Sequence, residues 1–215
     1  MTKPKPKGKR GRPKVMPDDQ RRALIVAEAE KLFVERGFNG TSTEQIAAHC
    51  QISKQTLYRL FPCKIELFAA VVESHRLSMI DLGDGYDDLP LDQALARIFM
   101  IGLDQPSYEL RAAFLRAAHV ESVQHPELRE ILRSRGGERT RTELAAWLDR
   151  QCAKGRLVID DPDNTAHMLM DMFTGAVIFE AIGGFGWATR EERMAHFRVC
   201  IDTFLNGTLP GSRRS

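Results

Sequence analysis

The feature that most limits the fold of this chain is a short stretch, residues 41–64, with the sequence TSTEQIAAHCQISKQTLYRLFPCK. It predicts two short helices joined by a tight turn. Each helix has a serine where an N-cap is needed: Ser42 precedes the first helix, Thr43–His49, and Ser53 precedes the second, Lys54–Phe61. Two short helices at a tight turn form the unit that places a helix in the major groove of DNA.

The second helix is expected to expose several kinds of polar group on one face. Leu57 and Phe61 lie four residues apart and are predicted to be buried. The side chains left facing solvent are Lys54, Gln55, Thr56, Tyr58 and Arg59. Together they supply the donors and acceptors that read base edges and hold phosphates.

A larger set of residues, between Arg22 and Glu73, extends the pattern around this unit. Its members are Ala27, Lys31-Leu32-Phe33, Arg36-Gly37-Phe38, Gly40-Thr41-Ser42-Thr43, Gln45-Ile46-Ala47, Ser53-Lys54, Thr56-Leu57-Tyr58, Phe61, Lys64 and Leu67. This pattern resembles the DNA-binding domain of the TetR family of bacterial transcriptional regulators. The family commonly has a glycine where this chain has Gln51 and a small residue where it has Gln55. The amide of Gln55 can bind adenine through two hydrogen bonds and so add specificity.

The resemblance implies an all-α fold with two domains. The first, 17–80, is an N-terminal three-helix helix-turn-helix domain, and the second, 81–215, is a C-terminal helical domain for ligand binding and dimerisation. Lys54, Gln55 and Thr56 are expected to face the bases of double-stranded operator DNA. The phosphate contacts are expected from Thr43, Tyr58, Arg59 and Lys64.

The mechanism implied by the resemblance is that of a homodimeric repressor. A small apolar effector shifts the C-terminal domain, the linking helix swings, and the two reading helices leave their half-sites. Three alternatives remain open: a constitutive dimeric DNA-binding protein without a ligand, an activator, and an enzyme that carries a DNA-binding appendage.

Residues 1–16 form a basic arm, which we expect to be disordered because proline and glycine interrupt it and it has no apolar pattern to bury. The arm holds seven basic side chains and no acidic one. Within it, Arg10-Gly11-Arg12-Pro13 resembles the core of an AT-hook, in which Arg10 and Arg12 lie along an A·T-rich minor groove. The alternative is a tail that adds only attraction to phosphates.

The rest of the chain shows helical periodicity and no convincing strand pattern. A helix over Asp18–Arg36 completes the small DNA-binding core. A helix over Cys63–Leu82 links the two domains and leads into an acidic, turn-rich loop at Asp81–Pro90. Further helices are expected over Leu91–Asp104, Ser107–Val120, Pro126–Lys154, Pro162–Ile182 and Arg190–Asn206.

Two C-terminal segments predict a dimer. Thr165–Ile182 is apolar nearly all round, which is typical of a helix buried on more than one side. The last helix has a narrower apolar stripe of Met194, Phe197, Ile201, and Phe204 or Leu205. In the resembling family the last two long helices of each subunit pair into a four-helix bundle. A core within one subunit could also bury them, but dimerisation is favoured because one reading helix binds too weakly for a specific operator.

Adaptable apolar side chains in the C-terminal helices could line a cavity for a small molecule. They are Phe99, Met100, Phe114, Met168, Met170, Met172, Phe173 and Phe179. The same spacing is typical of an ordinary core, so no ligand-binding residue is predicted from the sequence.

Nothing in the sequence points to catalysis, a cofactor or a metal site. The six histidines are scattered, the four cysteines form no C-x-x-C pair, and no phosphate-binding glycine motif occurs. No apolar run approaches the about 18 residues of a membrane helix, and the basic N-terminal segment lacks the apolar stretch of a secretory signal, so we expect none. Residues 1–62 carry 13 Lys and Arg against 6 Asp and Glu, whereas residues 63–215 carry 18 against 23. We therefore expect a cytoplasmic regulator that meets DNA with its basic N-terminal end, and not an enzyme.

Deletion of residues 1–16 should weaken DNA binding and flatten the plot of log K against log salt, because each lost phosphate contact removes about 0.9 from that slope. Fluorescence anisotropy over a salt series measures both quantities. If Arg10 and Arg12 enter the minor groove, the loss should be larger on operators with A·T-rich flanks. Equal losses on A·T-rich and G·C-rich flanks would reduce the arm to a nonspecific tail.

Overall fold

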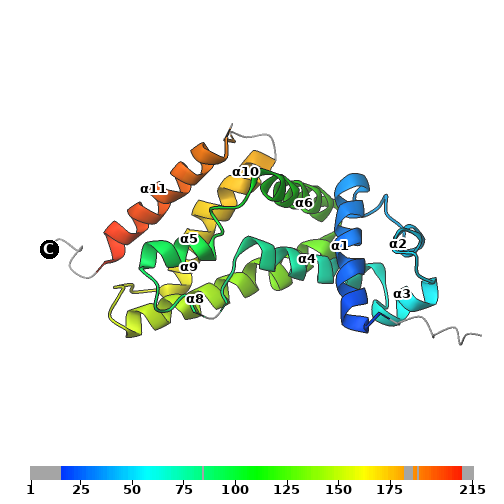
Figure 1. Ribbon diagram of the computed structural model, residues 1–215, viewed down its shortest axis with the longest axis horizontal. Helices are drawn as coiled ribbons and strands as arrows, with labels where there is room; N and C mark the ends of the chain where they lie inside the picture. Colours follow the sequence, from blue (N-terminus) through cyan, green and yellow to red (C-terminus); the bar gives the residue numbers. More distant parts are fainter. Residues whose placement is uncertain (1–15, 84, 182–185, 188, 210–215) are drawn as a thin grey trace, which may run out of the picture.

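The chain is described here by a computed structural model that covers residues 16–83, 85–181, 186–187 and 189–209. Its helices are α1 Asp18–Arg36, α2 Thr43–His49, α3 Lys54–Leu60, α4 Lys64–Met79, α5 Leu91–Ile98, α6 Gln105–Gln124, α7 Pro126–Ile131, α8 Glu138–Ala153, α9 Pro162–Met170, α10 Ala176–Ala181 and α11 Arg190–Thr208, with π-helical segments η1 Leu132–Gly137 and η2 Asp171–Gly175. These residues contain no strand, which confirms the all-α prediction. α1, α2 and α3 lie together at one end of an elongated molecule, and α11 lies far from them (Figure 1). The basic arm with Arg10 and Arg12 lies outside the described residues.

The helix-turn-helix unit is capped as its sequence predicts. Ser42 Oγ accepts the N–H of Gln45, and the Gln45 side chain accepts the N–H of Ser42, which completes a capping box. Ser53 caps α3 by accepting the N–H of Thr56. In the turn between the helices, Gln51 takes a φ of 54°, in the left-handed region that usually favours glycine. The backbone therefore keeps the conformation for which the resembling family commonly uses glycine.

The first hydrophobic core joins α1–α4 to helices from the other half of the chain. The rings of Phe33 and Phe68 meet edge-on with centroids 5.6 Å apart, and Phe68 lies 6.3 Å from Phe114 of α6. Ala118 of α6 and Leu128 of α7 belong to the same buried cluster. Helices that follow residue 80 thus complete the core of the helix-turn-helix half, and Figure 1 shows α6 running up to α1.

A second core fills the space between α5, α6, α8, α9, η2 and α11. Phe99 and Phe173 stack with ring centroids 4.0 Å apart, and Phe173 lies 5.1 Å from Phe197 of α11. Arg193 is buried here with its guanidinium 3.8 Å from the Tyr108 ring centroid. This cation–π contact holds α11 against α6.

The two long C-terminal helices predicted as single elements each contain a π-helical segment. The helix predicted over Pro126–Lys154 is α7, η1 and α8, and it ends at Ala153. Its two glycines, Gly136 and Gly137, lie in η1, where the helix continues in a wider form. The helix predicted over Pro162–Ile182 is α9, η2 and α10, described as far as Ala181 because Ile182 lies outside the described residues.

Other helix ends differ from the predictions by a few residues. The linking helix α4 is shorter than predicted and ends at Met79. α5 ends at Ile98 and not at Asp104, because Met100 takes a φ of 49° and interrupts the helix. Asp104 instead caps α6 by accepting the N–H of Ser107, so α6 begins two residues before its predicted start.

The apolar segment α9–η2–α10 buries one face within the subunit and leaves another uncovered. Ala166, Leu169 and Phe173 enter the second core. Met168 and Phe179 are 56% and 52% exposed. Single exposed apolar side chains are normal on a protein surface, whereas several on one helical segment indicate a surface that binds a partner.

The final helix α11 uses most of its predicted apolar stripe inside the subunit. Phe197 and Ile201 are buried in the second core, and Phe204 and Leu205 pack against it. Val199, on another face of the helix, is 62% exposed. None of the described helices combines the length and the apolar character that crossing a bilayer requires.

Candidate nucleic-acid interface and cavity

α3 lies at the end of the molecule formed by α1–α3 (Figure 1), and one of its faces is polar and exposed. The side chains buried beneath it are Leu57, Leu60 and Phe61. The side chains that it exposes are Lys54, Gln55, Tyr58 and Arg59, with Thr56 half-buried. The Gln55 side chain makes no hydrogen bond to the part of the chain that the structure describes. Its amide is therefore available to a base edge.

Hydrogen bonds tie the polar side chains of α3 to α2. The hydroxyl oxygens of Thr43 and Tyr58 lie 2.8 Å apart. Lys54 Nζ donates to Glu44 Oε1 over 2.9 Å, and this bond is the main reason why the pKa of Glu44 is lowered to about 2. Because both pairs face solvent, exchanging them for contacts with DNA costs little.

Arg59 is held by the first turn of α1. Its Nη1 and Nη2 donate to the two oxygens of Asp18 over 2.6 and 2.8 Å. The hydrogen bond to Asp18 raises the pKa of Arg59, and the hydrogen bond from Arg59 lowers the pKa of Asp18. The guanidinium is thus oriented on the reading surface, which is the exposed face of α3 with Lys54, Gln55, Tyr58 and Arg59. A phosphate that binds Arg59 has to share it with Asp18 or displace that carboxylate.

Lys64 is turned toward the fold, although it was predicted to hold a phosphate. Its Nζ donates to the carbonyl oxygens of Phe38 and Thr41 over 2.7 and 3.0 Å and lies 4.0 Å from the centroid of the Phe38 ring. Burial lowers the pKa of Lys64. The ammonium therefore fastens the start of α4 to the segment between α1 and α2, and phosphate binding by Lys64 stays a prediction.

Three residues that support this surface were missed by the sequence analysis. Asp18 and Glu44 orient Arg59 and Lys54. Arg22 donates to the carbonyl of Leu60 at the end of α3 and lies 4.4 Å from the Phe61 ring centroid. Asp18 and Arg22 come from α1, far along the chain from α3, so no local pattern signals their role.

A polar junction connects α6 to the helix-turn-helix half. Glu121 Oε1 accepts the backbone N–H of Phe38 over 2.8 Å. Asn39 Nδ2 and His125 Nε2 lie 2.7 Å apart. Gly37 takes a φ of 72°, and a Cβ there would lie 2.3 Å from Glu121 Oε1. The positive φ favours glycine at this position, and a larger residue would displace the Glu121 carboxylate from Phe38.

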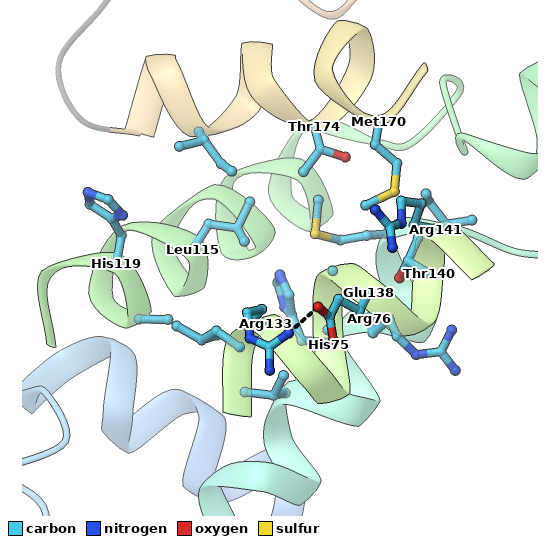
Figure 2. Close-up of a pocket in the computed structure, with 18 of the residues that line it drawn as sticks. His75, Arg76, Leu115, His119, Arg133, Glu138, Thr140, Arg141, Met170 and Thr174 are labelled. Atoms are coloured by element: carbon cyan, nitrogen blue, oxygen red, sulfur yellow. Dashed lines mark hydrogen bonds and ion pairs between the residues drawn. The ribbon is translucent and has the colours of Figure 1, made fainter. Parts of the chain in front are cut away.

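A cavity of about 520 Å³ lies beside this junction, between α4, α6, η1, α8 and the α9–η2–α10 helix. Figure 2 shows Thr174 and Met170 on one side of it, with His75 and Arg133 on the other. Among the described atoms, three buried polar groups of the lining have no hydrogen-bond partner: His75 Nε2, Arg76 Nε and Arg141 Nε. A space of this size accepts a small organic molecule.

Only some of the Phe and Met side chains that the sequence suggested for a cavity line the one observed. Phe114 and Met170 line it. Phe99 and Phe173 are buried in the second core, while Met168 and Phe179 face outward. Over the described ranges, His, Cys, Asp and Glu nowhere gather in a group of three that could hold a metal ion.

Two protein-family models match the chain. Residues 25–71 match the model described as bacterial regulatory proteins, tetR family. Residues 94–207 match the model of the AefR-like transcriptional repressor, C-terminal domain. The second match alone spans more than half of the 215 residues.

Individual relatives agree with these matches. The HTH-type transcriptional activator FasR of Mycolicibacterium smegmatis is 35% identical over 71 residues, which is 33% of this chain and 32% of that protein, so the chain matches about a third of that relative's length. A TetR-family regulator from Mesorhizobium loti has the same fold, with a TM-score of 0.73 and 22% identity over 91% of this chain and 100% of the other. The flavonoid-responsive regulator FrrA superposes with a TM-score of 0.64 and 26% identity over 90% of this chain and 99% of its own.

Truncation of Gln55 to alanine should cost about 1–3 kcal/mol of binding free energy at one base position and relax the preference there. Tyr58→Phe, which removes only a hydroxyl, should weaken binding to all sequences alike. Selection of bound sites from random DNA, followed by titration of the selected site, measures both effects. The assignment of Gln55 to a base fails if Gln55→Ala leaves the preferred sequence and the affinity unchanged.

Proposed function

The chain belongs to the TetR family of helix-turn-helix transcriptional regulators, and we propose that it is a homodimeric, cytoplasmic repressor that leaves its operator when a small, largely apolar molecule enters the cavity. The observation that carries this proposal is that the cavity and the helix-turn-helix core share side chains. Val72, Phe114 and Ala118 belong to the first core and also line the cavity. A molecule in the cavity would therefore touch the packing that holds α1–α4 together.

Close packing gives such a molecule a route to the reading surface. Protein interiors have little free space, so a displaced core side chain moves its neighbours. Two polar links between the halves run beside this packing: Glu121 with Phe38 and His125 with Asn39. Within the helix-turn-helix half, His75 of α4 contacts Glu30 of α1. A shift of α4 or α6 would carry α1 with it, and with α1 the Asp18 carboxylate that orients Arg59.

Release of DNA then follows from the geometry of a dimer. Two reading helices bind a palindromic operator only at half-site spacings of about 34–36 Å. A ligand that binds better to another arrangement of the two halves shifts the population toward it. DNA and ligand then each weaken the binding of the other.

The uncovered apolar side chains near the C-terminus support a dimer. Met168 and Phe179 are more than half exposed in the single chain, as is Val199 on α11. The two helical segments that carry them are those whose counterparts pair in the resembling family. Pairing them with a second copy would remove these side chains from water, which favours association.

Repression is favoured over activation by the extent of the two matches. The model named for a repressor covers 94–207, whereas the relative named as an activator matches over 71 residues only. A constitutive DNA-binding protein would have no use for a cavity of about 520 Å³ with buried, unpartnered nitrogens. The name of FrrA as a flavonoid-responsive protein supports control by a small molecule.

Phe179→Glu should convert the dimer into a soluble monomer, because a buried unpaired charge costs about 3–5 kcal/mol. Sedimentation velocity measures the assembly, and operator binding should fall with it. Leu110→Glu, at a similarly exposed apolar residue on α6, is the matched control and should leave the dimer intact. A Phe179→Glu variant that stays a dimer, or an unmodified chain that binds a palindromic operator tightly as a monomer, contradicts this arrangement.

Thr174→Phe should fill part of the cavity and weaken the binding of any effector while it preserves operator binding. A thermal-shift screen with apolar compounds identifies ligands, since a ligand at 100 times its Kd stabilises the native state by about 2.7 kcal/mol. The same compounds should then shift the melting temperature of the variant much less. Thr142→Phe, on the exposed face of α8, should behave like the unaltered protein. If no compound stabilises the unaltered protein, a constitutive DNA-binding protein becomes the better interpretation.

A further inference from the structure

One buried histidine in the cavity lining has an unused nitrogen. His75 is 5% exposed, and its ring centroid lies 4.3 Å from that of Phe114. Its Nδ1 lies 3.2 Å from Oε1 of Glu30, whereas Nε2 has no partner among the described atoms. Buried polar atoms are normally satisfied, so an unpartnered nitrogen beside a cavity points to a missing partner.

The surroundings of His75 decide which nitrogen carries the proton. Burial lowers the pKa of His75, and this effect outweighs the opposite effect of Glu30, so the ring is neutral near pH 7. A carboxylate only accepts hydrogen bonds, so the proton lies on Nδ1 and is donated to Glu30. Nε2 is then a lone-pair acceptor and needs a donor.

The other polar groups of the lining are mostly donors that already have partners. Arg133 pairs with Glu130 and Glu138. Arg141 Nε lies 3.4 Å from Asp163 Oδ1, within ion-pair distance, but its N–H makes no hydrogen bond among the described atoms. Arg76 pairs with Glu143 and keeps only its Nε–H without an acceptor. Arg129 donates to the carbonyl of Ser122. Of the remaining ionisable groups in the lining, His167 lies 3.9 Å from Asp171 and His119 is exposed.

We propose, resting on the effector role argued above, that the molecule bound in this cavity is an apolar compound with a hydroxyl group, a phenol or an alcohol, that donates its proton to His75 Nε2. A hydroxyl donates one hydrogen bond and can accept others, so its oxygen also suits a wall that carries N–H groups. A carboxylate has no proton for Nε2. An ammonium could donate, but it would meet the guanidiniums of the lining.

The rest of the lining suits the body of such a molecule. Apolar walls come from Met79, Ile80, Leu115, Met170 and Ile178. Figure 2 shows Leu115 and Met170 on different helices around the space that His75 also borders. The imidazole would bind the ligand through Nε2, while Nδ1 contacts Glu30 of α1. His75 would therefore connect the ligand to α1.

The test compares three probes that share one apolar body: 2-naphthol, 2-methoxynaphthalene and 2-naphthoate. Calorimetric titration of the full-length dimer gives their dissociation constants. We expect 2-naphthol to bind about tenfold more tightly than the methoxy compound, which keeps the oxygen but cannot donate. His75→Phe should abolish this difference, whereas His119→Phe, at another histidine of the same lining, should keep it.

Several results would overturn the assignment. They are equal binding of the hydroxyl and methoxy probes, tightest binding of 2-naphthoate, no binding of any probe, and a preference that survives His75→Phe. Because His75 is buried, His75→Leu is prepared as a second variant, and the probes on the unaltered protein decide the matter if neither variant folds.

The proposed function has a separate readout. Operator affinity is measured with and without each probe. If 2-naphthol is preferred but leaves operator affinity unchanged, the hydroxyl assignment stands and the release mechanism fails. If operator affinity falls equally with the hydroxyl and methoxy probes, the release mechanism stands and the hydroxyl assignment fails.

Discussion

The rest of this structure depends on one packing contact, the insertion of Phe114 from α6 into the helix-turn-helix half. Its side chain is 1% exposed, and its ring faces both Phe68 and His75. Small helical units bury too little apolar surface to be very stable on their own. α6 and α7 supply the missing wall of this one. The same ring lines the cavity, so the packing that stabilises the DNA-binding half also makes it sensitive to what the cavity contains.

Exposed and buried polar groups have different roles in this structure. At the reading surface, Lys54 with Glu44 and Arg59 with Asp18 form exposed pairs. Such pairs orient side chains without locking them, which suits groups that have to exchange a carboxylate for a phosphate. At the junction and in the cavity, a buried polar group without a hydrogen-bond partner costs free energy. His75 Nε2 is such a group, so a ligand that donates a hydrogen bond to it would be stabilised there.

The cavity is lined in part by two segments that depart from regular α-helical winding. η1 and η2 both contribute to its lining, and π-helical segments are frequent at functional sites. A Cβ added at Gly137 or Gly175 would meet nothing within 4 Å, so these glycines leave space open. The glycine pair of η1, Gly136 and Gly137, thus lies within a continuous helix and beside the cavity.

Local signals in the sequence determined the helices and the reading face. Apolar periodicity predicted Asp18–Arg36 to the residue, and the Ser42 cap helped to predict Thr43–His49, because both signals are local to the element that they describe. The exposed face of α3 follows from the helical period in the same way. Only the tertiary structure decided which distant groups meet, such as Arg59 with Asp18 and His75 with Glu30. It also decided that the apolar stripe of α11 is mostly core and where the cavity opens. The physical reason is that distances between helices are set by long-range packing, which a period along one helix does not encode.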